Sequence, residues 1–195
     1  MMAISAQNTT IHVAIATWEM STYFDKKKKF NGIKLQTSKW MRPPSETAPT
    51  NAKAAGLYMI CTLSKHIAEK NGFDDSLMLD SNGYVAESTG ANIFLVKNNK
   101  LYTPVADCFL NGITRQTVID LARKNNINVT EKRIYPKELF NADEIFLTGT
   151  AVEITPISQI DNKKFNVGEV TKKLISLFSD SVSYTHLTLP TNREV

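Results

Sequence analysis

The chain has 195 residues, enough for one sizeable hydrophobic core or two small ones. Its hydrophobic content of 42% and charged content of 22% are ordinary for a soluble globular protein, and its formal net charge is +4. Much of that positive charge comes from the lysine run at residues 26–29, which has no interleaved aromatic residues to stack on bases. The composition therefore argues against a nucleic-acid-binding module.

Cysteine and histidine are sparse. Cys61 and Cys108 are too few and too far apart for a disulfide framework or a zinc site, and the three histidines have no metal-ligand spacing. No apolar run is long enough to span a membrane, and no signal peptide opens the chain. We therefore expect a cytoplasmic protein with no metal site and no membrane partner.

Both ends of the chain differ in character from its middle. Residues 1–10 are expected to be the remnant of an interdomain linker, and the apolar, β-branched residues 11–16 predict a strand. That strand has no earlier element to pair with, as expected of a chain that begins inside a larger protein. Residues 181–195 resemble a translated sequencing-adapter tail and are expected to be foreign, which leaves residues 11–180 as the domain.

Periodicity and turn residues predict a mixture of antiparallel hairpins and separate helices between these ends. This mixture indicates an α+β or mixed α/β fold. In chain order we expect a strand at 33–38, a loop at 40–45, a helix from about 53 to 72, an antiparallel meander of strands at 76–79, 84–87, 92–96 and 101–103, a helix at 112–125, a strand at 129–134, a short helix at 136–140, strands at 144–148 and 153–157, and a terminal helix at 170–178.

Lys53 stands among small residues where the helix of residues 53–72 is expected to begin. Thr50 or Asn51 can cap that helix, but a lysine is unfavourable at the positive end of a helix dipole. The small residues 54–56 leave room for a flat ligand near the backbone. The pattern suggests an amine kept for Schiff-base chemistry. On this segment alone, a solvated lysine on a first helical turn is the simpler interpretation.

Three further stretches carry groups that complement such a lysine. Glu87 ends an expected strand, where it is either a solvated hairpin residue or the partner of a protonated ring nitrogen. Residues 110–114 form a glycine-bearing turn that opens a helix, which is a natural phosphate site. The hydroxyl-rich strand end at residues 148–151 can give further bonds to phosphate or carboxylate. Taken together, these groups are what pyridoxal phosphate requires.

The order and spacing of these motifs resemble the larger domain of branched-chain amino acid aminotransferases, which are fold-type IV pyridoxal-phosphate enzymes. The resemblance covers about residues 3–178 and implies the fold of the large C-terminal domain of the D-amino-acid-aminotransferase-like enzymes. It rests on residues 52–56, 79–80, 83–87, 90–94, 111–115 and 148–156.

The resemblance implies a role for each motif residue toward pyridoxal 5'-phosphate. Lys53 would form the Schiff base and move the proton of the reaction, while Glu87 would keep the ring nitrogen protonated. Tyr58 would bond the phenolic oxygen of the ring, and Leu110 would pack on its face. The phosphate side is assigned to Gly112, Ile113, Thr114 and Thr150, and the substrate side to Met20, Thr150 and Ala151.

The activity implied by the resemblance is transamination of leucine, isoleucine or valine with 2-oxoglutarate, in a homodimer or larger homo-oligomer. The chain departs from the family pattern in lacking the smaller N-terminal domain, so we expect a gene fragment with an incomplete site. It also has Met20 where the family commonly places a tryptophan. Methionine keeps that wall apolar and adaptable.

Other functions remain open at this point. An aminodeoxychorismate lyase or a D-amino acid aminotransferase would share the fold, although residues 151–156 and the apolar surroundings of Trp18 and Met20 favour the branched-chain enzyme. A non-catalytic fragment that binds only a partner subunit is a third possibility, and a nucleic-acid module is the least supported.

Overall fold

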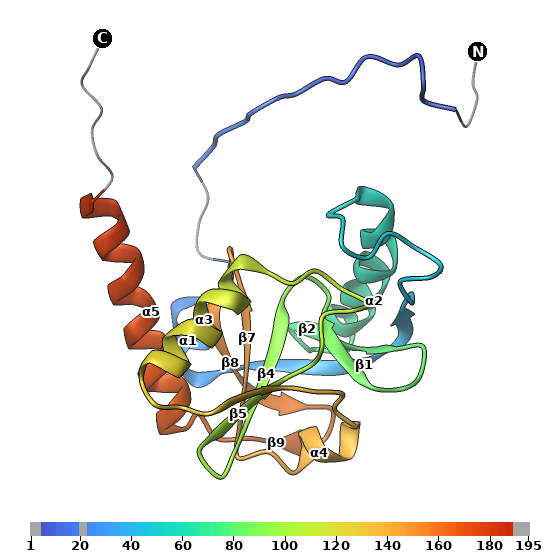
Figure 1. Ribbon diagram of the computed structural model, residues 1–195. Coiled ribbons are helices and arrows are strands. Elements are labelled where there is room, and N and C mark those ends of the chain that lie inside the picture. The colour runs from blue at the N-terminus through green and yellow to red at the C-terminus, as the bar shows by residue number, and fades with distance from the viewer. Residues whose placement is uncertain (1–4, 20–22, 189–195) are drawn as a thin grey trace.

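The computed structural model of the chain describes residues 5–19 and 23–188. Runs of consecutive strands, β2 to β5 and β7 to β9, are separated by helices (Figure 1). The helices are α1 (Lys26–Asn31), the 3-10 helix η1 (Ala55–Tyr58), α2 (Met59–Lys70), α3 (Ile113–Lys124), α4 (Pro136–Phe140) and α5 (Glu169–Thr188). The strands are β1 (Ile33–Arg42), β2 (Asp75–Asp80), β3 (Val85–Ser88), β4 (Asn92–Lys97), β5 (Lys100–Thr103), β6 (Val129–Glu131), β7 (Glu144–Gly149), β8 (Glu153–Ile160) and β9 (Lys163–Lys164).

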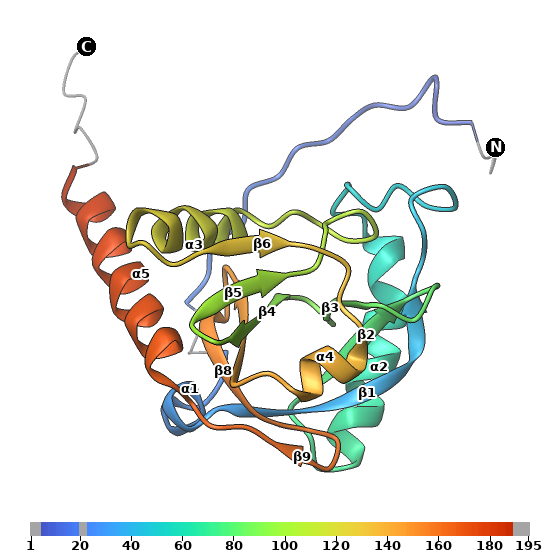
Figure 2. The same cartoon turned by 60° about the horizontal axis from the view of Figure 1, so that its bottom comes forward.

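Six of the strands close into a barrel. They follow the order β3-β2-β1-β8-β7-β4, and a further pairing of β3 with β4 joins the two ends of this path. Strand β1 runs parallel to both of its neighbours, whereas the other pairs of the ring are antiparallel. Strands β5 and β6 extend the sheet beyond β4, and Figure 2 shows the ring with α4 seen within it. The predicted α+β class and the antiparallel meander of β2 to β5 are confirmed.

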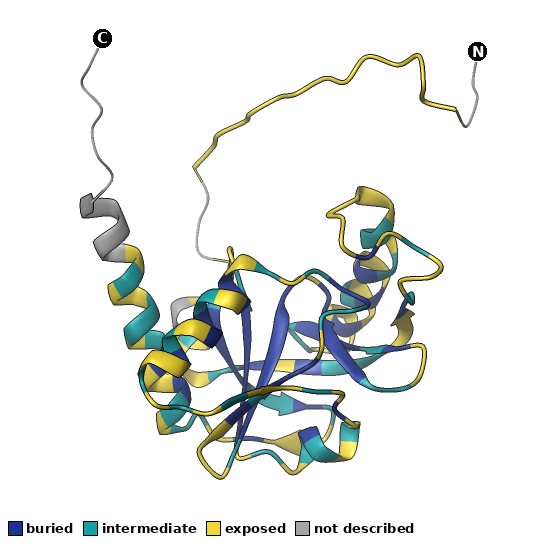
Figure 3. Cartoon of the chain, in the orientation of Figure 1, coloured by how far each residue is buried: buried dark blue, intermediate teal, exposed yellow. Residues whose placement is uncertain are grey.

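Two apolar clusters lie on opposite faces of the barrel wall. In β4, Ile93 and Leu95 belong to one cluster, while Phe94 and Val96 belong to the other, as the two-residue period of a strand requires. The first cluster includes Leu139 of α4 and fills the inside of the barrel. The second packs under α3 and α5, where the rings of Phe94 and Phe146 stack with centroids 5.1 Å apart. Figure 3 shows the buried strands at the centre of the molecule.

The strand predicted at residues 11–16 is wrong. This segment is extended, but it pairs with no strand among the described residues and runs away from the barrel (Figure 1). Ile11, Val13 and Ile15 are 88%, 87% and 92% exposed. A β-branched sequence becomes a strand only where a neighbouring backbone completes its hydrogen bonds, and here none does.

The start of the first long helix also differs from the prediction. Lys53 precedes η1, and Ala54 occupies the N-cap position without a side-chain hydrogen bond. The predicted cap Thr50 donates its hydroxyl to the carbonyl of Asp107 instead, at 3.0 Å. The Thr50 hydroxyl therefore ties this loop to the segment before α3, and no side-chain cap is found at the start of η1. The left-handed stop at Gly72, with φ of 81°, is as expected.

Strand and helix ends shift in three other places. Strand β1 continues to Arg42, so the loop begins at the first proline rather than at residue 40. Strand β6 ends at Glu131, earlier than expected, and α5 extends to Thr188, beyond the predicted end at residue 178.

The foreign origin of residues 181–195 stays a prediction, and Met20 and residues 189–195 lie outside the described residues. Within the described ranges, no helix combines the length and apolarity needed to cross a membrane.

Candidate active site

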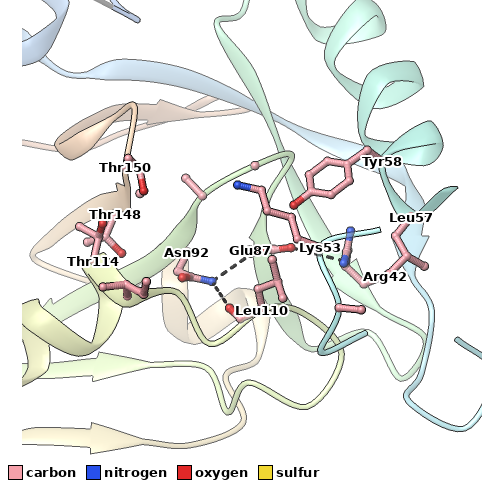
Figure 4. Close-up of a pocket in the computed structure, with 15 residues that line it drawn as sticks. Arg42, Lys53, Leu57, Tyr58, Glu87, Asn92, Leu110, Thr114, Thr148 and Thr150 are labelled. Atoms are coloured by element: carbon pink, nitrogen blue, oxygen red, sulfur yellow. Dashed lines mark hydrogen bonds and ion pairs between the residues drawn. The ribbon is translucent and has the colours of Figure 1, made fainter. Parts of the chain in front are cut away.

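A pocket opens at one end of the barrel (Figure 4). Its walls come from the ends of β1 and β7, from β3 and the start of β4, and from the loops before η1 and α3. Seven residues singled out from the sequence line it: Lys53, Tyr58, Glu87, Leu110, Ile113, Thr114 and Thr150. Gly112 is adjacent, Ala151 is not among the lining residues, and Met20 is outside the described ranges.

Glu87 is the buried carboxyl of the site. It lies on β3 opposite Asn92 of β4 and is only 7% exposed. The Asn92 amide donates to Glu87 Oε2 at 3.2 Å, and Arg42 Nε lies 3.5 Å from Glu87 Oε1. Burial raises the pKa of Glu87 to about 8, although the Arg42 guanidinium opposes that shift. Burial therefore favours the neutral carboxyl, whereas the adjacent Arg42 guanidinium favours the carboxylate.

Arg42 is a site residue that the sequence interpretation missed. It ends β1, is 4% exposed, and lies in the pocket wall. Besides facing Glu87, it donates from Nε to the carbonyl of Cys108 at 3.3 Å and contacts Cys61 Sγ through Nη1 at 3.2 Å. A buried cation must be paired to be tolerated, so this side chain ties β1 to α2 and to the loop before α3. The two prolines after it had predicted a loop at residues 40–45.

Lys53 reaches the pocket from an exposed part of the turn-rich loop between β1 and η1. Figure 4 shows its amine directed into the space between Tyr58, Glu87 and Asn92. Tyr58 stands at the junction of η1 and α2, where burial raises the pKa of its hydroxyl and the Glu87 charge adds to the effect. An amine, a phenol and a carboxyl thus converge from three elements on one cavity.

A second carboxyl supports the turn that follows Glu87. Asp75, at the start of β2, accepts hydrogen bonds from the Thr89 hydroxyl and from the backbone N–H of Ser76. Burial raises the pKa of Asp75, and its charge contributes to the raised pKa of Glu87. Asp75 thereby fixes the β3–β4 turn beside the pocket. No cluster of three or more histidine, cysteine or acidic side chains suited to a metal ion occurs in the described part of the chain.

The opposite wall of the pocket offers neutral hydrogen-bond donors. Helix α3 begins here with Gly112 at its N-cap, and no side chain caps it. A Cβ at Gly112 would lie 2.5 Å from Asn92 Oδ1, so only glycine allows the helix to start this close to β4. Thr114 on the first turn and Thr150 after β7 line the same wall. An uncapped helix start with nearby hydroxyls is suited to an anion.

Thr148 also lines this wall, and its buried hydroxyl makes no hydrogen bond within the described part of the chain. It is fully buried, and its Oγ1 has no hydrogen-bond partner, alone among the buried side-chain polar atoms of the described residues. Leaving a buried hydroxyl unpaired costs about 1–3 kcal/mol. The sequence pointed to residues 148–151 as a hydroxyl-rich end but singled out Thr150, because burial and lost partners are not visible in a sequence.

The chain matches the family model for class IV amino-transferases over residues 3–160. It belongs to the class IV aminotransferases. The branched-chain-amino-acid aminotransferase of Pseudomonas aeruginosa is 40% identical to this class IV chain over 185 residues, which is 93% of the chain and 60% of that protein. The enzyme of the same name from Salmonella typhimurium is 37% identical over 173 residues, 87% of the chain and 56% of that protein.

Solved structures of branched-chain amino acid aminotransferases share the fold of this class IV chain. The enzyme from Thermoproteus uzoniensis with norvaline has a TM-score of 0.78 and 39% identity, covering 82% of this chain and 54% of that one. The Escherichia coli enzyme has a TM-score of 0.81 and 36% identity, covering 84% and 55%. An aminotransferase from Brucella abortus bound to the cofactor PLP has a TM-score of 0.77 and 36% identity, covering 84% and 57%. The chain therefore spans only a little more than half the length of the relatives it matches.

Proposed function

We propose that this chain carries the cofactor-binding part of a pyridoxal 5'-phosphate-dependent transaminase for branched-chain L-amino acids. One observation carries the proposal: a lysine amine, a buried carboxyl and an uncapped helix start line the same pocket. The family match supports the reaction class, and the relatives' names support the substrate class. Because the chain covers little more than half of those relatives, we propose that it holds only part of the complete site.

The residues present fit the cofactor at both of its polar ends. The protonated ring nitrogen is a cation, and it would find Glu87 buried and able to ionise beside it. The phosphate is an anion, and it would find the start of α3 with the hydroxyls of Thr114 and Thr150. The acidic group thus lies where the cationic ring nitrogen would bind, and the hydrogen-bond donors lie where the anionic phosphate would bind.

The chain's own groups would then have distinct tasks. Lys53 Nζ would hold the cofactor covalently and carry the proton that leaves the substrate Cα. Glu87 would keep the ring nitrogen protonated, the Tyr58 hydroxyl would donate to the phenolic oxygen, and Leu110 would cover one face of the ring. When bound, pyridoxal phosphate supplies the electron sink that stabilises negative charge at the substrate Cα.

Leucine, isoleucine and valine are the proposed amino donors, and 2-oxoglutarate is the proposed acceptor. One related branched-chain aminotransferase is seen complexed with N-(5'-phosphopyridoxyl)-L-glutamate and, in another structure, with 4-methylvaleric acid, which has a leucine-like branched chain. These two ligands support a site that accepts both the glutamate and the branched-chain side of the exchange. Thr150 and Ala151 remain our proposed contacts for the substrate carboxylate.

We also propose that the complete enzyme is a homo-oligomer. Three apolar residues, Met59, Leu63 and Ile67, recur every fourth position on α2 and are exposed. They form a stripe distinct from Cys61 and Ala68, which face the protein interior. An exposed apolar stripe on a regular helix is suited to packing against a second copy.

Reductive trapping tests the proposal on the chain itself. The chain is incubated with pyridoxal 5'-phosphate, reduced with borohydride and digested, and the modified lysine is located by mass spectrometry. We expect label on Lys53, no label at that position in Lys53→Ala, and unchanged labelling in the exposed control Lys27→Ala. Label scattered over the surface lysines would contradict the assignment.

Substrate turnover separates the proposed reaction from that of a lyase with the same fold. With leucine and 2-oxoglutarate, the proposal requires glutamate and the branched 2-oxo acid in equal amounts. An aminodeoxychorismate lyase would release pyruvate from aminodeoxychorismate instead. Pyruvate release without formation of the branched 2-oxo acid would replace our proposal with that activity.

A further inference from the structure

The unpaired hydroxyl of Thr148 is placed where an apolar residue would pack equally well. Thr148 follows Phe146 on the same face of β7, and Phe146 belongs to the apolar cluster under α3 and α5. Valine has nearly the same shape as threonine and would leave no polar group unpaired. A buried hydroxyl without a partner at this position indicates that a bound molecule supplies the partner.

Neighbouring contacts show which side of the pocket this hydroxyl faces. Thr148 pairs directly with Asn92 across β4 and β7, so the two side chains lie on the same face of the sheet. Asn92 donates to the carbonyl of Leu110 at 3.0 Å, and its Oδ1 fills the space beside Gly112. Thr148 is therefore next to the start of α3. Figure 4 shows it with Thr114 and Thr150, on the side of the pocket away from Tyr58.

The two cationic side chains that line the pocket are engaged away from the start of α3, so uncharged hydrogen-bond donors matter most for an anion bound there. Arg42 is paired with Glu87, and Lys53 has its own proposed task, so neither is free to neutralise an anion at the start of α3. Among the groups of the described pocket, backbone N–H groups and hydroxyls are then left to contact an anion bound there. Thr114 and Thr150 supply two hydroxyls, and Thr148 supplies a third that no group of the described chain uses.

We infer that the Thr148 hydroxyl donates a hydrogen bond to a phosphate group bound at the N-terminus of α3. This inference rests on the proposed function, in which that phosphate belongs to pyridoxal 5'-phosphate. Thr148 thus anchors the cofactor's phosphate together with Thr114 and Thr150. Its hydroxyl stays unpaired without the ligand because the site is built around the ligand.

The test compares Thr148→Val with Thr148→Ser in the same chain. Calorimetry measures the binding of inorganic phosphate and of pyridoxal 5'-phosphate, and phosphate-free pyridoxal serves as the matched ligand. We expect Thr148→Val to weaken both phosphate-bearing ligands about tenfold, as loss of one hydrogen bond to a charged group does, and to leave pyridoxal binding unchanged. Thr148→Ser keeps the donor and should bind within about twofold of the original chain.

A stability measurement distinguishes this role from a structural one. Thr148→Val should unfold at the same temperature as the original chain or higher, because valine removes an unpaired buried group. Absent phosphate binding, equal weakening of both pyridoxal forms, or a clearly lower melting temperature for Thr148→Val would overturn the inference. If pyridoxal could then still be trapped on Lys53, the proposed function would stand without the role for Thr148. If neither pyridoxal nor pyridoxal 5'-phosphate could be trapped there, the proposed function and the Thr148 inference would both fail.

Discussion

The residues that line the pocket differ in how firmly the fold holds them. Glu87, Asn92 and Thr148 sit on paired barrel strands and are buried, and Asn92 is clamped between two acceptors. Lys53 and Thr150, by contrast, are exposed residues of connecting segments. The barrel therefore holds the groups that we propose to recognise the cofactor, whereas the lysine proposed to bind it covalently stands on an exposed loop. In this proposal, rigid recognition groups lower the ordering cost of binding, and an accessible lysine lets the cofactor enter.

The largest expected effect concerns the proton bound by Glu87, one of the firmly held residues of the pocket. Glu87 has a folded-state pKa of about 8 against an ordinary value of 4.5. The folded state therefore holds this proton more tightly than the unfolded chain, and the free energy of unfolding should fall as pH rises between these values. The maximum slope for one group is about 1.4 kcal/mol per pH unit.

Glu87→Gln mimics the protonated carboxyl and should remove that slope. Urea denaturation at several pH values between about 5 and 8 measures it for both chains. Asp75 also has a raised pKa and contributes a slope of the same sign in both chains, so the difference between the two slopes reports the effect of Glu87. Identical slopes for the two chains would show that Glu87 ionises freely in the folded state.

A smaller effect on stability is expected where the start of α3 packs against Asn92 of β4. Gly112→Ala places a methyl group 2.5 Å from Asn92 Oδ1, and Asn92 cannot move without losing its bonds to Glu87 and Leu110. We expect a loss of about 1–3 kcal/mol in unfolding free energy, as overpacking typically gives, and weaker phosphate binding.

Gly90→Ala is the matched control, because Gly90 lines the same pocket but has open space around its Cβ position. Chemical denaturation and phosphate titration of both variants measure the difference. If Gly112→Ala and Gly90→Ala behaved alike, the close approach of α3 to Asn92 would not constrain the site.

The smallest effect contrasts one residue type in two settings. Ile145→Val removes a methyl group from the barrel interior and should cost about 0.5–1.5 kcal/mol. Ile15→Val makes the same change in the exposed N-terminal segment and should alter stability by less than about 0.5 kcal/mol. Thermal and urea unfolding measure both. A comparable cost at Ile15 would mean that this segment packs against the protein in solution.

Much of the fold was predictable because its signals are local. The short apolar runs of β4 and β7, the turn residues between β2 and β5, and Gly72 at the end of α2 each reflect neighbours along the chain. Residues 11–16 carry an equally good strand signal and form no strand, because pairing needs a second strand beside them. Local pattern shows what a segment is able to form, and the available partners decide whether it forms.

The sequence by itself determined the order of the elements and the chemical groups of the site: Lys53, Glu87 and the glycine-threonine turn before α3 were all identifiable from their spacing. Only the tertiary structure decided how those groups behave. Arg42 faces Glu87, Thr50 turns to Asp107, and the Thr148 hydroxyl lacks a partner because barrel closure brings distant segments together. Desolvation and pairing depend on such long-range neighbours, so pKa shifts and unsatisfied donors appear only once the chain is folded.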